Sequence, residues 1–226
     1  MPLPPGIHHL RPTLPIHVFE AAAPGPTALI QAGIHGDEIA GVHALAELLE
    51  AGRRPLRGRL LVIPVMNPPA YRARTRAAPG GLDLNRCFPG DPADPAAERR
   101  LAADLMALVR DEQPALMATL HESHKRYDPA RVPSFGQTLV YGVTPCPPLF
   151  TQVVARLNTA LESEEERWDT LYYPVATSST EVIVDALGCL GVCVETWMGF
   201  PEARRVAMMT AVVGALLDEV GVGLSS

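Results

Sequence analysis

Short apolar runs alternate along this chain with longer segments in which apolar residues recur at the period of a helix. This alternation is typical of an α/β domain, because a helix packs on the sheet in the crossover between parallel strands. We therefore predict a mixed, mostly parallel sheet that is flanked by helices on both faces. The expected strands are 14–20, 27–32, 58–65, 115–120, 138–143 and 191–195, and the expected helices are 37–51, 97–112 and 202–220.

Composition narrows the class of protein. The chain has 226 residues, of which 47% are hydrophobic and 19% charged, so it can bury one core, and we expect a single domain over 1–226. A net charge of −6 argues against a nucleic-acid partner, which would require a basic face. No apolar run approaches the roughly 20 residues that span a bilayer, so we expect no membrane association. Four cysteines without a CxxC pair suggest a cytoplasmic location.

One stretch, 66–90, is rich in proline and glycine and shows neither helical nor strand period. Loops longer than about 12 to 15 residues are usually functional or disordered. Apolar residues near its end argue against disorder. We therefore predict a functional loop that presents arginines to an anion, and the candidates are Arg72, Arg74, Arg76 and Arg86.

The segment GIHGDE places His35 and Glu38 where a predicted strand ends and a helix begins. Imidazole and carboxylate are natural zinc ligands, and a catalytic zinc site usually has three protein ligands and one open position. His121, at the end of another predicted strand, is the expected third ligand, and His124 is its nearest competitor.

Glu195 ends an apolar run, where a carboxylate is costly unless it is paired or functional, and we interpret it as a general base. The loop residues Asn85 and Arg86 also follow a predicted strand. Ligands of open α/β sheets bind outside the carboxyl ends of the strands. We therefore expect all these polar groups to converge at one edge of the sheet.

These motifs resemble those of the zinc carboxypeptidase superfamily, which includes the succinylglutamate desuccinylase and aspartoacylase branch as well as the peptidases. The resemblance runs from about Gly33 to Gly199. It rests on the G-x-H-G-D-E box at 33–38, the DLNRCFPG segment at 83–90, His121 and Glu195. It implies a zinc carboxypeptidase-like fold.

The resemblance also implies roles for individual residues. One zinc ion would be bound by His35, Glu38 and His121, and Glu195 would take the proton of the attacking water. Asn85 and Arg86 would hold a substrate carboxylate. The arginine that polarises the scissile carbonyl matches Arg76 best, with Arg72 and Arg74 as alternatives, and the mobile tyrosine of carboxypeptidases would be Tyr173 or Tyr172.

The implied activity is hydrolysis of an amide bond next to a carboxylate, on a small molecule or short peptide. The deacylase branch usually has Asp-Leu-His at the third ligand and a further β-rich domain. Here the triplet begins with Thr119, and only about 30 residues follow Glu195. Both features favour a carboxypeptidase-like enzyme without the extra C-terminal β domain.

Three alternatives stay open at this point. The helix at 97–106 resembles the deacylases, so an N-acyl amino acid deacylase is the first alternative. The threonine at position 119 suggests a non-catalytic, zinc-dependent module that binds carboxylates, and a closed structural metal site is the third. Manganese, cobalt or nickel could replace zinc on such ligands. Side-chain specificity and oligomeric state are left open.

Overall fold

A computed structural model describes residues 1–131, 133–161 and 163–225 of the chain. Within them, eight strands form one sheet in the order β1-β2-β4-β3-β5-β8-β6-β7. The pairs β3–β4, β3–β5, β5–β8 and β6–β7 are parallel, and the others are antiparallel. The strands are β1 (Gly6–Arg11), β2 (Leu14–Glu20), β3 (Thr27–Ala32), β4 (Arg59–Ile63), β5 (Leu116–Ser123), β6 (Thr138–Tyr141), β7 (Asp169–Tyr172) and β8 (Leu190–Trp197).

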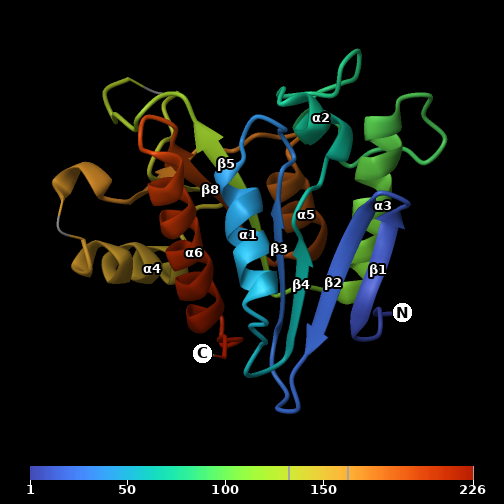
Figure 1. Cartoon of the computed structure of the whole chain (residues 1–226), viewed down its shortest axis with the longest axis horizontal. Helices are drawn as coiled ribbons and strands as arrows, with labels where there is room; N and C mark the ends of the chain where they lie inside the picture. The colour runs from blue at the N-terminus through green and yellow to red at the C-terminus, as the bar shows by residue number, and fades with distance from the viewer. Residues whose placement is uncertain (132, 162, 226) are drawn as a thin grey trace.

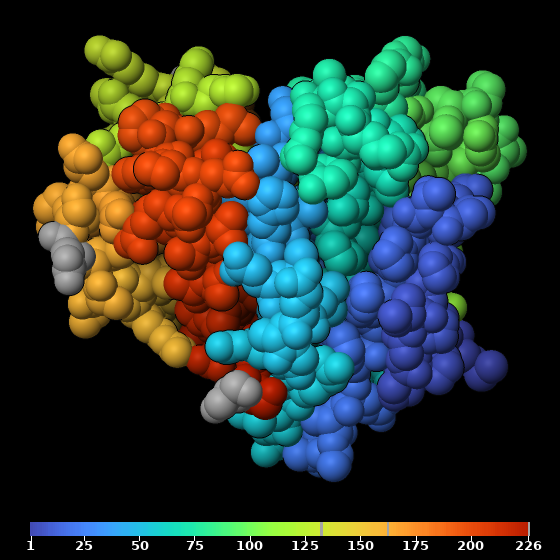
Figure 2. Space-filling view, viewed as in Figure 1, coloured from blue at the N-terminus to red at the C-terminus, as the bar shows by residue number. Residues whose placement is uncertain are grey.

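Helices cover both faces of the sheet, as predicted (Figure 1). α1 (Ala40–Glu50), α4 (Pro148–Thr159) and α6 (Glu202–Glu219) pack on one face, and α3 (Ala97–Glu112) and α5 (Ser179–Leu187) pack on the other. Figure 2 shows α1 and α6 side by side on the first face. The short elements are α2 (Pro68–Ala73) and the 3-10 turns η1 (Leu84–Arg86) and η2 (Glu164–Glu166).

The central strands are apolar on both sides because both faces of the sheet are covered. In β3, Ile30 packs with α1 and α6, whereas its neighbour Leu29 packs with α3. Both side chains are fully buried or nearly so. This core holds the carboxyl ends of β3, β5 and β8 in fixed positions, which matters for the site described below.

Several predicted boundaries are confirmed, and others are wrong. β2, β3 and α3 have the predicted bounds. β5 and β8 continue past their predicted ends, because the parallel ladder between them runs on through the pairs His121–Glu195 and Ser123–Trp197. His121 and Glu195 therefore lie within strands and do not end them.

Other elements were not expected. β1 and β7 lie at the two edges of the sheet, where burial imposes little apolar alternation on the sequence. α4 and α5 were missed as well, and the stretch 66–90 contains α2 and η1. The first helix begins at Ala40 instead of residue 37, because the chain turns at 36–37 after β3 before the helix starts. Among the described residues, no helix is both long and apolar enough to cross a membrane.

Candidate active site

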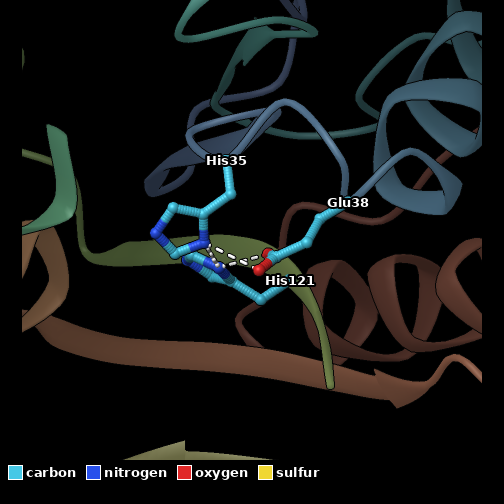
Figure 3. Close-up of side chains that lie close together, drawn as sticks. All are labelled: His35, Glu38 and His121. Atoms are coloured by element: carbon cyan, nitrogen blue, oxygen red, sulfur yellow. Dashed lines mark hydrogen bonds and ion pairs between the residues drawn. The ribbon is translucent and has the colours of Figure 1, made fainter. Parts of the chain in front are cut away.

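Three side chains predicted as metal ligands meet in one buried cluster (Figure 3). His35 and Glu38 come from the turn between β3 and α1, and His121 comes from β5. Nδ1 of His35 lies 2.7 Å from Oε1 of Glu38, and Nδ1 of His121 lies 2.7 Å from Oε2 of the same carboxylate. The three residues are 3 to 6% exposed. The predicted convergence of these side chains is therefore present.

The cluster has the chemistry and spacing of a metal site. The Nδ1 atoms of His35 and His121 face each other at 3.2 Å. Ligand atoms on a tetrahedral zinc ion, at about 2.0–2.1 Å from it, stand about 3.3 Å apart. Two imidazoles and one carboxylate also form a donor set that zinc accepts. The residues present thus fit a single divalent cation.

Asp83 holds His35 from the outside of the cluster, and sequence reasoning did not single it out. Its Oδ1 lies 3.2 Å from Nε2 of His35, and its Oδ2 accepts a hydrogen bond of 3.0 Å from Nε of Arg76. A carboxylate on the far ring nitrogen fixes which nitrogen of a histidine faces the metal. The signal was available, because Asp83 opens the DLNR motif in which only Asn85 and Arg86 were considered.

His121 has no equivalent support. Its Nε2 is buried and forms no hydrogen bond within the described part of the chain. Thr119, two residues earlier on the same strand, instead accepts a hydrogen bond from Gln31 at 3.2 Å. Among the described residues, the outer nitrogen of His121 is therefore unsupported, while Asp83 supports that of His35.

The electrostatics of the cluster follow from burial and close charges. Burial lowers the pKa of His35, but the carboxylates of Glu38 and Asp83 outweigh it and raise this pKa to about 9. For Glu38, burial acts to raise the pKa, yet the two histidines hold it well below its usual range. The cluster thus concentrates negative charge on a buried carboxylate, as a cation site requires.

Glu195 lies beside this cluster because β5 and β8 are paired in parallel with His121 opposite Glu195. Its Oε2 is buried and has no partner among the described residues, and its Oε1 accepts a weak hydrogen bond of 3.6 Å from Sγ of Cys193. Burial, followed by the charge of Glu38, raises the pKa of Glu195 to about 8. Cys193 shares a strand face with Glu195 and lines the same pocket.

Asn85 and Arg86 lie at the side of the pocket, on η1. Oδ1 of Asn85 accepts a hydrogen bond of 3.0 Å from the backbone N–H of Ser179, at the start of α5. Arg86 is exposed, and within the described residues its guanidinium donates only to the carbonyl of Asn85, at 2.9 Å. The remaining donors of Arg86 are free to hold a carboxylate.

The pocket has a volume of about 500 Å³, and some of the residues predicted for the site line it whereas others do not. Arg76 and Tyr173 both face it, and the ring of Tyr173 packs edge-on against Phe135. Arg72 and Arg74 are not among its lining residues, and the guanidinium of Arg74 stacks on Tyr71 instead. The lining also includes His124, which is exposed and lies outside the metal cluster.

Two sequence comparisons agree with this geometry. Residues 24–124 match the family described as the succinylglutamate desuccinylase/aspartoacylase catalytic domain. N-alpha-acetyl-L-2,4-diaminobutyric acid deacetylase of Halomonas elongata is 39% identical over 106 residues, which are 46% of this chain and 30% of that protein. Murein peptide amidase A of Escherichia coli is 36% identical over 152 residues, which are 60% of this chain and 61% of that protein. The matches thus span less than two thirds of either relative.

The fold is also similar to that of solved structures. The product-bound cell shape determinant protein Csd4 of Helicobacter pylori superposes with a TM-score of 0.83 over 94% of this chain and 56% of that one, at 20% identity. At this identity the likeness shows the fold alone. The family match, the relatives and the fold together support the zinc carboxypeptidase-like superfamily for this chain.

Proposed function

We propose that this protein is a zinc-dependent hydrolase that cleaves an amide bond next to a carboxylate, with residues 1–226 acting as one catalytic domain. The single observation that carries the proposal is the meeting of His35, Glu38 and His121 beside Glu195 in one pocket. The hydrolytic names of the relatives support the reaction class. A cytoplasmic location stays a prediction.

In the proposed reaction, each of the pocket residues has a separate role. A zinc ion held by His35, Glu38 and His121 would supply a Lewis acid that makes water nucleophilic near neutral pH. Glu195 is placed to accept the proton of that water and to deliver it to the leaving amine. Arg76, which Asp83 holds by its Nε, can turn another donor to the oxygen of the scissile carbonyl.

The substrate is oriented by its own carboxylate. Arg86 offers a planar set of donors that suits bidentate binding of a carboxylate. Asn85 positions this arginine through the contact of its own side chain with the start of α5. The proposed substrate is therefore a small peptide or other small molecule with a carboxylate close to the scissile amide.

We propose a carboxypeptidase-like activity on small peptides as the first candidate. The match to murein peptide amidase A, which extends over 60% of this chain, favours it. The second candidate is deacylation of an N-acyl amino acid. The family match at 24–124 and the similarity to the Halomonas elongata deacetylase favour that reading.

A hydrolysis screen tests the proposal. The zinc-loaded protein would be incubated with short peptides, including cell-wall peptides, and with N-acyl amino acids, and the products identified by mass spectrometry. We expect cleavage of one set, and we expect Glu195→Gln to lower kcat by at least about 100-fold while zinc stays bound, because general acid–base catalysis contributes that much or more.

The outcomes separate the candidates. Cleavage confined to peptides supports the first candidate, and cleavage confined to N-acyl amino acids supports the second. Metal content, measured by elemental analysis of both proteins, is the control for the substitution. If the protein cleaves neither set although zinc is bound, the proposal is overturned in favour of a module that binds carboxylates.

A further inference from the structure

A buried glutamine lies among the apolar residues of β3. Gln31 is the last residue but one of this strand and is 0% exposed, and the other residues from Ala28 to Ala32 are apolar. A fully buried amide is costly unless its polar atoms are hydrogen-bonded. The chemistry described above gives Gln31 no role, so its hydrogen bonds must show what it contributes.

Both hydrogens of the Gln31 amide nitrogen are used. Nε2 donates to Oγ1 of Thr119 on β5, at 3.2 Å, and to Oγ of Ser179, the first residue of α5, at 3.1 Å. Thr119 and Ser179 are both 0% exposed. A hydroxyl group that accepts from a nitrogen donor keeps its own hydrogen for another acceptor. The hydrogens of these two hydroxyl groups are therefore available to other residues.

Ser179 holds the side-chain amide of Asn85 in one orientation. Oδ1 of Asn85 accepts a hydrogen bond of 3.0 Å from the backbone N–H of Ser179 and a second, of 3.4 Å, from its hydroxyl. A backbone N–H can only donate, so the atom of the Asn85 amide that faces α5 is the oxygen. Because the Ser179 hydroxyl accepts from Gln31, its own hydrogen is directed to the same oxygen. The amide nitrogen of Asn85 therefore points away from α5.

The nitrogen of Asn85 is the part of this amide that is left for a ligand. Asn85 and Arg86 both line the pocket, and within the described residues Nδ2 of Asn85 forms no hydrogen bond. An amide nitrogen offers two donors, whereas a carboxylate only accepts. If the amide turned over, its oxygen would face the carboxylate that Arg86 holds, and two acceptors would meet. Recognition of the carboxylate therefore depends on the orientation of this amide.

The other hydrogen bond of Gln31 leads away from Asn85. Oγ1 of Thr119 lies 3.4 Å from Oγ1 of Thr180, and neither threonine side chain bonds to Asn85 within the described part of the chain. The two bonds of Gln31 are thus similar in length and burial, but only the bond to Ser179 continues to Asn85. This difference provides a control inside the same cluster.

We propose that Gln31 and Ser179 are positioning residues. They fix the side-chain amide of Asn85 so that its Nδ2 donates a hydrogen bond to the substrate carboxylate that Arg86 holds. This inference rests on the proposed function, and it adds to the same pocket two residues that do not touch the substrate.

Paired ligands with and without a carboxylate test the inference. Alanyl-alanine is compared with alanyl-alaninamide, and Nα-acetylalanine with Nα-acetylalaninamide. Titration calorimetry in the Glu195→Gln background gives the dissociation constants, and kcat and KM are measured without that substitution where cleavage occurs. We expect the acid of a pair to bind about ten-fold or more tightly than the amide, as charged hydrogen bonds allow.

Two substitutions remove the bonds that lead to Asn85. Gln31→Met keeps an unbranched side chain without the amide, and Ser179→Ala removes the hydroxyl. Each should reduce the preference for the acid by about three-fold to ten-fold, the usual effect of one hydrogen bond. For a cleaved acid, the loss should appear in KM while kcat stays within two-fold of wild type, because neither residue contacts the reacting atoms.

Thr119→Val is the matched control. It keeps the shape of the side chain and removes the bond of Gln31 that does not continue to Asn85. We expect the preference for the acid to stay within two-fold of wild type. An equal loss in Thr119→Val and Gln31→Met would mean that general loosening of the cluster acts, and would overturn the inference.

The orientation of Asn85 can also be followed without metal or substrate. The chain has three asparagines, Asn67, Asn85 and Asn158, so labelling with 15N-asparagine gives three side-chain amide signals in NMR spectra. Asn85→Asp identifies the signal of Asn85. We expect this signal to shift in Gln31→Met and in Ser179→Ala, and to stay in place in Thr119→Val.

The outcomes separate this inference from the proposed reaction. An Asn85 signal that is unchanged in Gln31→Met would overturn the inference, whether or not the protein is a hydrolase. If no substrate is cleaved but the acid preference is present and falls in Gln31→Met, the inference is supported and the hydrolytic function is not. Equal binding of acid and amide by the protein with Gln31 intact would overturn both the inference and the carboxylate-binding part of the proposed function.

Discussion

At the scale of single residues, neighbours decide what a side chain does. His35 and His121 both contribute Nδ1 to the cluster, but within the part of the chain that the structure describes only His35 has a carboxylate behind its ring. Asp83 and Thr119 were visible in the sequence, whereas the contact between Asp83 and His35 was not, because it depends on how the loop that holds Asp83 folds over the turn after β3. The support of the metal site is therefore asymmetric.

This asymmetry predicts that Asp83→Asn weakens zinc binding by about 10-fold to 100-fold, as the loss of such outer contacts typically does. The amide can still accept the hydrogen bond that Asp83 now accepts from the backbone of Asn85, so the turn should persist. Competition with a chromophoric chelator measures the affinity. Asp91→Asn, an exposed change in the same loop, is the control, and equal zinc affinity in all three proteins would contradict the prediction.

At the scale of elements, the turn between β3 and α1 is shaped by close packing against α2. A Cβ atom at Gly36 would overlap the backbone of Ala70 and Tyr71. The backbone N–H of Gly36 also donates to the carbonyl of Thr75 at 3.0 Å. Position 36, the second glycine of the G-x-H-G-D-E box, must therefore be a glycine, because α2 lies directly on the turn that carries His35 and Glu38.

We therefore expect Gly36→Ala to lower the free energy of unfolding by about 1 to 3 kcal/mol, which is the usual cost of overpacking, and to weaken metal binding as the turn shifts. Gly214→Ala is the matched control. Gly214 lies inside α6 with open space at its Cβ, so alanine there should raise stability by roughly 0.5 to 1 kcal/mol. Urea denaturation measures both, and a Gly36→Ala protein as stable as wild type would refute the packing argument.

At the scale of the whole molecule, one buried ion pair ties three elements together next to the site. Glu122, on β5 directly after His121, pairs with Arg205 of α6 and accepts a hydrogen bond of 2.8 Å from the backbone N–H of Ala40 at the start of α1. Glu122 is 4% exposed. The pair joins two helices to the strand that carries a proposed metal ligand.

Breaking a buried pair leaves an uncompensated charge, so Glu122→Gln should destabilise the fold by about 3 to 5 kcal/mol. The exposed pair between Arg156 and Asp218 offers the comparison, and Asp218→Asn should cost less than about 1 kcal/mol. Urea unfolding of both variants gives the two free energies. Similar small losses would show that the buried pair does not stabilise the arrangement of α1, β5 and α6.

By itself, the sequence determined the fold class, the central strands and the identity of the proposed ligands. Apolar runs and helical periods reflect burial: buried positions dominate β3 and β5, and in α3 they recur along one face of the helix. The edge strands β1 and β7 show little apolar pattern in the sequence, because their positions are less buried. Only the tertiary structure decided that β5 and β8 run past His121 and Glu195 and that Asp83 holds His35. Each of these depends on contacts between segments distant in the chain, which local patterns do not encode.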